Sequence, residues 1–256
     1  MPKRWRYLHH DVGSVSALEQ QAGLSPVVAQ LLTCRGITKA QDAKSFLDAK
    51  LTTLRDPESL PGVTDAADRI HAASQSDRRI TIYGDYDADG MTATAVLFNC
   101  LKLLGANVNY YVPNRLDEGY GLNDEALKKL ADRGSSMVIS VDCGIASVEQ
   151  AELARQLGLE LIVTDHHQMG DQLPNAAAIV HPCLPGHFYP FGGLCGAGVA
   201  FKLAWAICQR ASDAQKVSPV MREFLMSAMG LVALGTVADV VPLLDENRIL
   251  VRHGLG

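Results

Sequence analysis

Short runs of aliphatic and β-branched residues alternate with longer amphipathic segments from residue 78 onward, and no other feature restricts the fold as strongly. Five runs have the composition and length of buried strands: 79–83, 108–112, 137–141, 159–164 and 178–180. Five segments have helical spacing, some with an Asn or Ser before them and a Gly after: 91–104, 124–133, 148–157, 199–210 and 219–234. Strands and helices in this order predict an α/β fold with a mainly parallel β-sheet flanked by helices.

The first 76 residues have a different pattern. Leucines and alanines recur at helical spacing in segments 27–33, 40–49 and 65–73, and no alternating strand pattern occurs. A chain of 256 residues is long enough for one large domain with a small appendage. We therefore predict a helical region at 1–76 and an α/β domain at 77–256.

Composition excludes several classes of protein. Hydrophobic residues make up 48% and charged residues 20%, which is typical of globular chains and not of disordered or fibrous ones. The basic start is not followed by an apolar run, and no eighteen consecutive residues are apolar, so we expect neither a secretion signal nor a membrane span. The six cysteines are scattered without a Cys-x-x-Cys pair, which favours a reduced cytoplasmic chain.

Three aspartates follow the first predicted strand. Asp85, Asp87 and Asp89 alternate there, so on extended backbone they point to one side. At about 4 Å and an effective dielectric near 20, each pair of carboxylates repels by roughly 4 kcal/mol, which a divalent cation relieves. A solvated Asp-rich turn is the alternative. A calcium-binding EF-hand loop is excluded, because its twelfth position is Val96 and a strand precedes it.

Two further strands also end in ionisable residues. Asp142 ends the run at 137–141, and Asp165, His166 and His167 end the run at 159–164. The carboxyl ends of parallel strands meet at one edge of a sheet, where open α/β folds bind ligands. Adjacent histidines on extended backbone face opposite ways, so we expect one to be a ligand and the other an acid or a phosphate contact. Taken singly, a turn aspartate or a surface histidine pair is the alternative.

Asp239 is the one charge in the apolar stretch 231–243. A buried carboxylate without a partner is costly, so it should meet a partner or a metal, although local capping beside Pro242 is also open. Carboxylates with an imidazole favour Mn²⁺ or Mg²⁺ over zinc. The formal charge of −5 is unusual for a nucleic-acid enzyme, but two bound divalent cations would bring it near −1.

Four stretches together resemble a known family: GDYDADG at 84–90, VDCG at 141–144, TDHH at 164–167 and GTVADVVP at 235–242. They are similar to the four ordered motifs of the DHH phosphoesterase superfamily, and to its RecJ branch in particular. Two more stretches, at 112–122 and 194–203, also resemble RecJ-type segments. The resemblance implies a metal-dependent exonuclease that hydrolyses single-stranded DNA in the 5′→3′ direction, in DNA repair and recombination.

The same resemblance implies roles for individual residues. It places Asp85 and Asp87 toward one Mn²⁺ or Mg²⁺ ion, and Asp89, His166 and Asp239 toward a second, with Asp142 bridging them; which aspartate touches which ion stays open. Catalytic roles fall on three residues: Asp142, His167 as a phosphate contact or proton donor, and Asp165 as an orienting carboxylate.

Three residues outside those motifs are candidate substrate contacts. Arg115 is a fork-shaped donor suited to phosphate, and Gly196 and Gly198 open a predicted helix whose N–H groups suit an anion. A surface arginine and a close-packed helix start are equally compatible with the sequence.

RecJ-like proteins continue into a DHH-associated domain and usually an OB-fold, and we find neither in this sequence. We therefore expect the chain to hold the metals with part of the DNA grip, and to be inactive or weakly active alone. Implied partners are single-stranded DNA, a single-strand-binding protein and a RecQ-type helicase, with no membrane. The alternatives are a DHH-type phosphodiesterase for oligonucleotides or cyclic dinucleotides, a pyrophosphatase, or an inactive DNA-binding relative.

Overall fold

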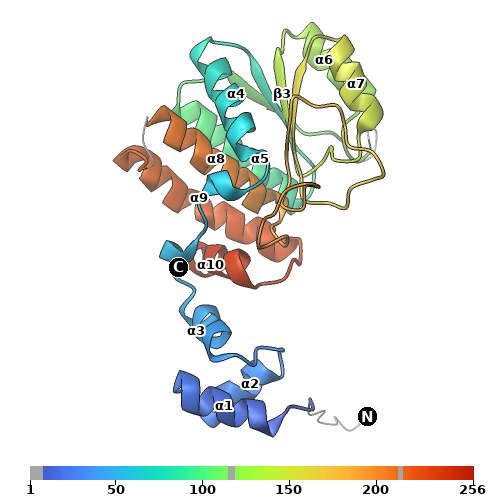
Figure 1. Cartoon of the computed structure of the whole chain (residues 1–256). Coiled ribbons are helices and arrows are strands. Elements are labelled where there is room, and N and C mark those ends of the chain that lie inside the picture. The colour runs from blue at the N-terminus through green and yellow to red at the C-terminus, as the bar shows by residue number, and fades with distance from the viewer. Residues whose placement is uncertain (1–7, 115–118, 213–215) are drawn as a thin grey trace, which may run out of the picture. The chain divides into compact units, whose positions relative to one another are not determined.

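A computed structural model describes residues 8–114, 119–212 and 216–256 (Figure 1). The chain divides into two compact units, Met1–Thr53 and Leu54–Gly256. The first unit contains α1 (Val12–Ala22), α2 (Pro26–Thr33), α3 (Ala40–Asp48) and the 3₁₀ turn η1 (Leu51–Thr53). Its small core consists of Leu18, Ala29, Leu32 and Ala43. These helices bury one apolar stripe against each other, as amphipathic helices do.

The second unit is built on five parallel strands in the order β2-β1-β3-β4-β5. Their bounds are β1 (Ile80–Tyr83), β2 (Val108–Tyr111), β3 (Met137–Val141), β4 (Glu160–Thr164) and β5 (Ala178–Val180). β1 and β3 are buried along their whole length, which explains why these runs are apolar without alternation. The structure confirms the predicted α/β class.

Helices cover both faces of the sheet (Figure 1). α6 (Asp124–Asp132) and α7 (Val148–Gln156) lie on one face, packed on β3 and β4. α4 (Val63–Gln75), α5 (Ala88–Leu103) and α8 (Gly196–Ala211) lie on the other. α9 (Pro219–Ala238) packs on α5 and α8, and α10 (Asp245–Gly254) packs on α9. A 3₁₀ turn, η2 (Pro57–Ser59), precedes α4.

The strand order places a topological switch point between β1 and β3. From β1 the chain first goes to β2 on one side and only later to β3 on the other. A crevice at the carboxyl ends of two such strands is where open α/β folds bind their ligands. Asp85 follows β1 and Asp142 follows β3, so both lie at this switch point.

Some boundaries differ from the sequence analysis. α5 begins at Ala88 instead of 91, α8 begins at Gly196 instead of 199, and α10 lacked a predicted counterpart. The division between compact units falls after Thr53, whereas the sequence pattern suggested 76. The reason is packing, because α4 contacts α8 and β5 and so belongs to the sheet-containing unit.

Within the described residues, α9 is the one helix long and apolar enough to cross a membrane by length and composition. A core helix of a folded domain passes the same test. α9 packs against α5, α8 and α10, and its carboxyl end leads directly into Asp239, while Met226, Leu234 and Val237 on the same helix are exposed.

Candidate metal centre

The three aspartates of the first motif lie on a turn from strand to helix. Asp85 follows β1 and is buried, while the Asp87 side chain caps α5 by accepting the N–H of Gly90 at 2.9 Å. Asp89 is buried in the first turn of α5. The expectation of three aspartates alternating on extended backbone is therefore wrong. An N-cap aspartate begins the helix three residues earlier than predicted, and the helical turn brings Asp89 back to the site.

The start of α8 holds Asp89 in place. Backbone N–H groups of Gly196 and Ala197 donate to the two Asp89 carboxylate oxygens at 2.6 and 2.9 Å. These orphan donors at a helix N-terminus, together with the helix dipole, favour a negative charge at this position. Gly196 was expected to offer its N–H to a substrate anion, but the structure directs it to Asp89. A Cβ at Gly198 would contact Leu194 at 3.2 Å, so that glycine serves close packing.

Asp142 occupies the middle of the site in a left-handed conformation, with φ of 62°. Such a conformation in a non-glycine residue is uncommon and strained. Its side chain is buried, and burial raises the pKa of Asp142 to about 7, against the opposing effect of His166 nearby. A carboxylate of this kind gains strongly from a cation.

His166 lies among three carboxylates. Its Nε2 atom is 3.1 Å from Asp142 Oδ1, 3.7 Å from Asp89 Oδ2 and 3.7 Å from Asp239 Oδ2. Asp142 Oδ1 and His166 Nε2 are nevertheless buried atoms without a hydrogen-bond partner, because the 3.1 Å contact lacks hydrogen-bond geometry. Buried polar atoms are nearly always paired, so these two atoms fit a missing ligand between them.

Among the residues that the structure describes, candidate ligand atoms fall into three groups, and within each group the atoms lie within 4.8 Å of one another. The groups are Asp85 with Asp87 and Asp142, Asp89 with His166 and Asp239, and Asp142 with His166 and His167. The first contains the two aspartates that the DHH resemblance assigns to one ion, and the second contains the three residues that it assigns to the other, but Asp142 joins only the first of these two groups. Such a donor set of carboxylate oxygens and imidazole suits hard divalent cations.

Asp165 orients both histidines. Its Oδ1 accepts the N–H groups of His166 and His167 at 2.7 and 3.1 Å and lies 2.8 Å from His167 Nδ1, while Oδ2 accepts the N–H of Ile145 at 2.9 Å. Burial opposes ionisation of Asp165, but these hydrogen bonds outweigh it and lower its pKa. Both oxygens of the Asp165 carboxylate thus accept hydrogen bonds from the protein.

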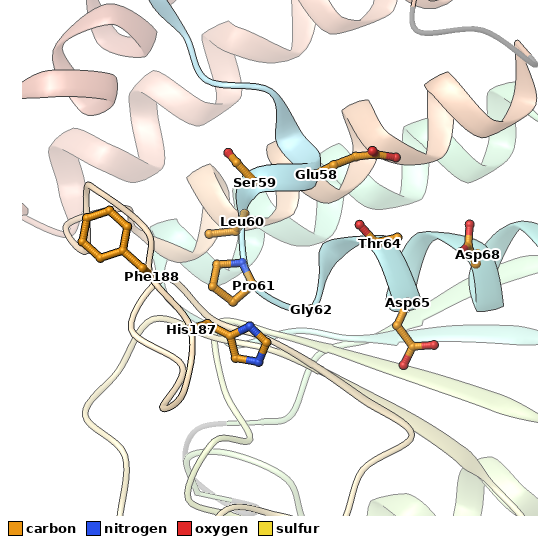
Figure 2. Close-up of a pocket in the computed structure, with 10 residues that line it drawn as sticks. All are labelled: Glu58, Ser59, Leu60, Pro61, Gly62, Thr64, Asp65, Asp68, His187 and Phe188. Carbon is orange, nitrogen blue, oxygen red and sulfur yellow. The ribbon is translucent and has the colours of Figure 1, made fainter.

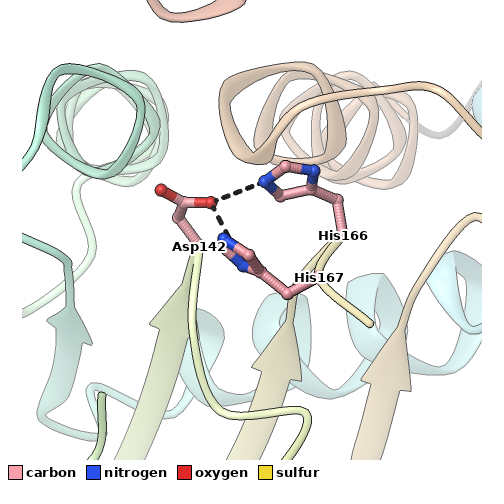
Figure 3. Close-up of side chains that lie close together, drawn as sticks. All are labelled: Asp142, His166 and His167. Atoms are coloured by element: carbon pink, nitrogen blue, oxygen red, sulfur yellow. Dashed lines mark ion pairs between the residues drawn. The ribbon is translucent and has the colours of Figure 1, made fainter. Parts of the chain in front are cut away.

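Both histidine rings point toward Asp142 (Figure 3). The expectation that they face opposite ways is wrong, because Asp165 binds both backbone N–H groups and bends the chain after β4. The Asp165 hydrogen bond raises the pKa of His167 to about 9. For His166, burial lowers the pKa, and the Asp142 carboxylate more than reverses that effect.

Asp239 follows the last residue of α9 and brings a carboxylate from that helix to the site. Its N–H donates to Gly235 O at 2.9 Å, and burial raises the pKa of its carboxyl group. The next residue, Val240, has φ of 62°, which is a rare conformation for a β-branched side chain. The helix thus stops abruptly where its carboxylate meets His166.

Two residues at the site were not predicted. The Tyr120 hydroxyl lies 3.2 Å from His167 Nδ1, and His181 Nε2 lies 2.9 Å from the His167 carbonyl. His181 directly follows β5, so the criterion that identifies Asp142, an ionisable residue at the carboxyl end of a strand, also applies to His181. Tyr120 lies in the stretch 112–122, which resembles a RecJ-type segment, but no role was predicted for it from the sequence. Arg115, predicted as a phosphate contact, lies outside the described residues.

A pocket of about 490 Å³ elsewhere is separate from this site (Figure 2). It lies beside η2 and the start of α4, and none of its lining residues belongs to the metal groups. Two of its acidic residues, Glu58 and Asp68, pair with Arg210. The pocket is therefore not part of the candidate metal centre.

The fold and the site together define a class of protein, namely an open parallel α/β domain with a cluster of acidic residues and histidines at its switch point. Residues 79–236 match the DHH family, N-terminal domain, and the chain belongs to this family. The resemblance drawn from the four motifs is thereby confirmed.

The chain is similar to proteins called single-stranded-DNA-specific exonuclease RecJ. It is 44% identical to the one from Bacillus subtilis (strain 168), over 98% of this chain and 30% of that protein. It is 40% identical to the one from Escherichia coli (strain K12), over 91% of this chain and 40% of that protein. The chain thus spans about a third of the length of the curated relatives it matches.

Solved structures agree with the sequence relatives. The crystal structure of RecJ in complex with Mn²⁺ from Thermus thermophilus matches 96% of this chain and 33% of that one, with a TM-score of 0.76 and 32% identity. The crystal structure of exonuclease RecJ bound to manganese matches 80% of this chain and 49% of that one, with a TM-score of 0.69 and 38% identity.

Proposed function

We propose that this chain carries the two-metal site of an exonuclease that hydrolyses single-stranded DNA in the 5′→3′ direction. The observation that carries the proposal is the position of His166 Nε2, within 3.1 to 3.7 Å of carboxylates from three separate elements. Asp142 follows β3, Asp89 lies in α5 and Asp239 ends α9. Bringing carboxylates from distant parts of the chain this close to one imidazole costs free energy, because the buried negative charges repel one another. A bound cation offsets that cost.

In this proposal the protein holds two Mn²⁺ or Mg²⁺ ions. Asp85 and Asp87 hold one, Asp89, His166 and Asp239 hold the other, and Asp142 lies between the two sets. Bound as a pair, such ions supply a nucleophile from water at neutral pH and neutralise charge on phosphate oxygens.

His167 has a different role in the proposal. The Asp165 carboxylate accepts its Nδ1–H and raises the pKa of the ring. A protonated imidazole beside the acidic groups can contact a phosphate oxygen or donate its proton to the leaving oxygen. Asp165 is then a positioning carboxylate.

The substrate class comes from the relatives, which are described as single-stranded-DNA-specific. We extend it to this chain together with a role in DNA repair and recombination, a cytoplasmic location, and partners of two kinds. These partners are a single-strand-binding protein and a RecQ-type helicase.

Digestion of end-labelled DNA tests the proposal. Single-stranded and duplex DNA, labelled at the 5′ or 3′ end, are incubated with the chain in Mn²⁺, Mg²⁺ or EDTA. We expect metal-dependent loss of the single strand from its 5′ end, and a loss of activity of at least about a thousandfold in Asp142→Ala. The matched control, Asp132→Asn, changes a carboxylate at the end of α6, toward the opposite edge of the sheet, and should leave activity intact.

Other outcomes identify the alternatives. Hydrolysis restricted to dinucleotides or inorganic pyrophosphate would replace the exonuclease with another DHH-type phosphoesterase. DNA binding without hydrolysis in any metal, by a chain that binds Mn²⁺, would indicate an inactive relative or a site completed by further domains. Hydrolysis unaffected by Asp142→Ala would contradict the assignment of the site.

A further inference from the structure

Tyr120 is presented to the metal centre by the segment that precedes α6. Its neighbours Gly119 and Gly121 have φ of 76° and 83°, a conformation that glycine adopts readily. The hydroxyl of Tyr83, which is fully buried at the end of β1, donates to the carbonyl of Gly121 at 3.0 Å. Leu122 is also buried. The segment is thus anchored directly after Tyr120.

The Tyr120 hydroxyl lies between two groups of the site. It is 3.2 Å from the backbone carbonyl of Asp142 and 3.2 Å from His167 Nδ1. Its ring meets the His167 ring edge-on, with centroids 5.8 Å apart. Because a carboxylate can only accept, His167 Nδ1–H donates to Asp165 at 2.8 Å, and the Tyr120 hydroxyl oxygen can share the same N–H as a second acceptor at 3.2 Å. The Tyr120 proton is then donated to the Asp142 carbonyl.

The hydrogen bond from Tyr120 is accepted by Asp142, the residue with the strained backbone. Asp142 has φ of 62°, and its N–H donates to Thr164 O at 3.0 Å. With the Tyr120 hydroxyl on its carbonyl, both polar groups of the Asp142 backbone are tied to neighbouring elements. Strained conformations persist only where the surroundings over-determine them. The carboxylate that depends on this conformation belongs to two of the three ligand groups.

We propose that Tyr120 is a positioning residue, which holds the left-handed Asp142 peptide and the His167 ring in the geometry that binds the cations. The expected effect on catalysis rests on the proposed function, whereas the expected effect on metal binding does not. Tyr120 acts through Asp142 and His167 and is not itself assigned contact with the reacting atoms.

The variant Tyr120→Phe tests this role, because it keeps the ring and removes the hydroxyl. Losing one hydrogen bond of ordinary strength weakens Mn²⁺ binding about three- to tenfold and lowers kcat by a similar factor, with KM changed less than about twofold. If Tyr120 were purely structural, Tyr120→Phe would lower the thermal unfolding midpoint of the metal-free protein. We expect this midpoint to stay within about 2 °C of the wild-type value. The matched control is Tyr110→Phe, since Tyr110 lies exposed on β2 against Phe98.

Mn²⁺ affinity is measured by calorimetric titration, and the His167 ring is followed by nitrogen NMR in the metal-free protein. We expect Tyr120→Phe to change the His167 ring signals and Tyr110→Phe to leave them unchanged. Wild-type Mn²⁺ affinity and ring signals in Tyr120→Phe would overturn the proposal, as would an affinity loss matched by a loss of thermal stability. If the wild type binds Mn²⁺ but hydrolyses no DNA, the exonuclease proposal fails, whereas the affinity comparison still decides the role of Tyr120.

Discussion

At the scale of single residues, two glycines allow helices to approach the acidic groups. A Cβ on Gly196 would lie 2.5 Å from Asp142 Oδ1, and one on Gly235 would lie 2.7 Å from Asp89 Oδ1. Cβ atoms do not occupy such short distances, so a side chain at Gly196 would displace Asp142. One at Gly235 would press on Asp89 and also on Thr92 Oγ1 at 2.5 Å and Ala197 Cβ at 2.8 Å. Both glycines are therefore needed for close approach, and their role at the metal centre is steric.

Two glycines within α9 permit a matched comparison. Gly235→Ala should displace Asp89 and weaken Mn²⁺ binding at least about tenfold, because a ligand misplaced by an ångström loses most of its contribution. Gly230→Ala has more space, with Gly254 O at 3.6 Å, and should stabilise the helix by about 0.5 to 1 kcal/mol. Calorimetric titration and urea unfolding of both variants check this. Equal Mn²⁺ affinity in the two variants would contradict the steric role of Gly235.

The sequence located the acidic residues better than it predicted their geometry. Asp142 and His166 follow buried apolar strands, and in a parallel sheet that is sufficient to place them at one edge. The direction of the His166 and His167 rings was not accessible, because it depends on hydrogen bonds from both backbone N–H groups to Asp165. Tyr120 is placed by a tertiary bond between Tyr83 and Gly121, which no local pattern reveals.

At the scale of elements, a buried ionic network connects α8, α10 and the segment before η2. Lys202 and Glu246 have fully buried side chains, with Nζ and Oε1 2.5 Å apart. Lys202 also donates to the Arg55 carbonyl at 2.7 Å, and Glu246 accepts from Tyr189. Burial lowers the pKa of Lys202, and Glu246 opposes that effect. α8 carries the amides that bind Asp89, and α10 follows Asp239, so the network joins two elements that support the site.

Removing one charged side chain from this buried network should lower the free energy of unfolding. Lys202→Met removes one of the two cations beside the buried Glu246 and leaves Arg55 Nη1 at 3.3 Å from its carboxylate. We therefore expect a loss of about 3 kcal/mol in the free energy of unfolding, the lower end for a broken buried pair. Adding Glu246→Gln should restore part of it. The control Lys128→Met, which breaks an exposed pair with Glu125 on α6, should cost less than about 1 kcal/mol. Urea denaturation measures all three, and similar losses for Lys202→Met and Lys128→Met would refute a structural role for the network.

Element boundaries were predicted where caps are local and mispredicted where side chains from the site serve as caps. The Asn123 side chain caps α6 and accepts the N–H of Ala126, as its position before the helix suggested. The start of α5 was placed late, because Asp87 was interpreted only as a ligand although it also caps the helix. α10 has no counterpart among the predicted helices, although acidic residues in its first turn and basic residues in its last turn are typical of a helix.

At the scale of the whole molecule, the parallel sheet and the position of the site followed from the sequence, whereas the division into units did not. The segment that forms α4 has the same helical spacing as those of α2 and α3, so periodicity grouped them together. Packing separates them, since α4 covers the sheet with α8. Five aspartates and two histidines meet at the switch point, and these aspartates contribute to the formal charge of −5.

The most direct test of this account is the number of Mn²⁺ ions that the chain binds, measured by calorimetric titration and by the loss of the free-ion signal in electron paramagnetic resonance. We predict two ions per chain in the wild type, with both affinities reduced by at least about tenfold in Asp142→Ala, because that carboxylate lies between the two ligand sets. Binding of no Mn²⁺, or two ions held equally well without Asp142, would contradict the central claim.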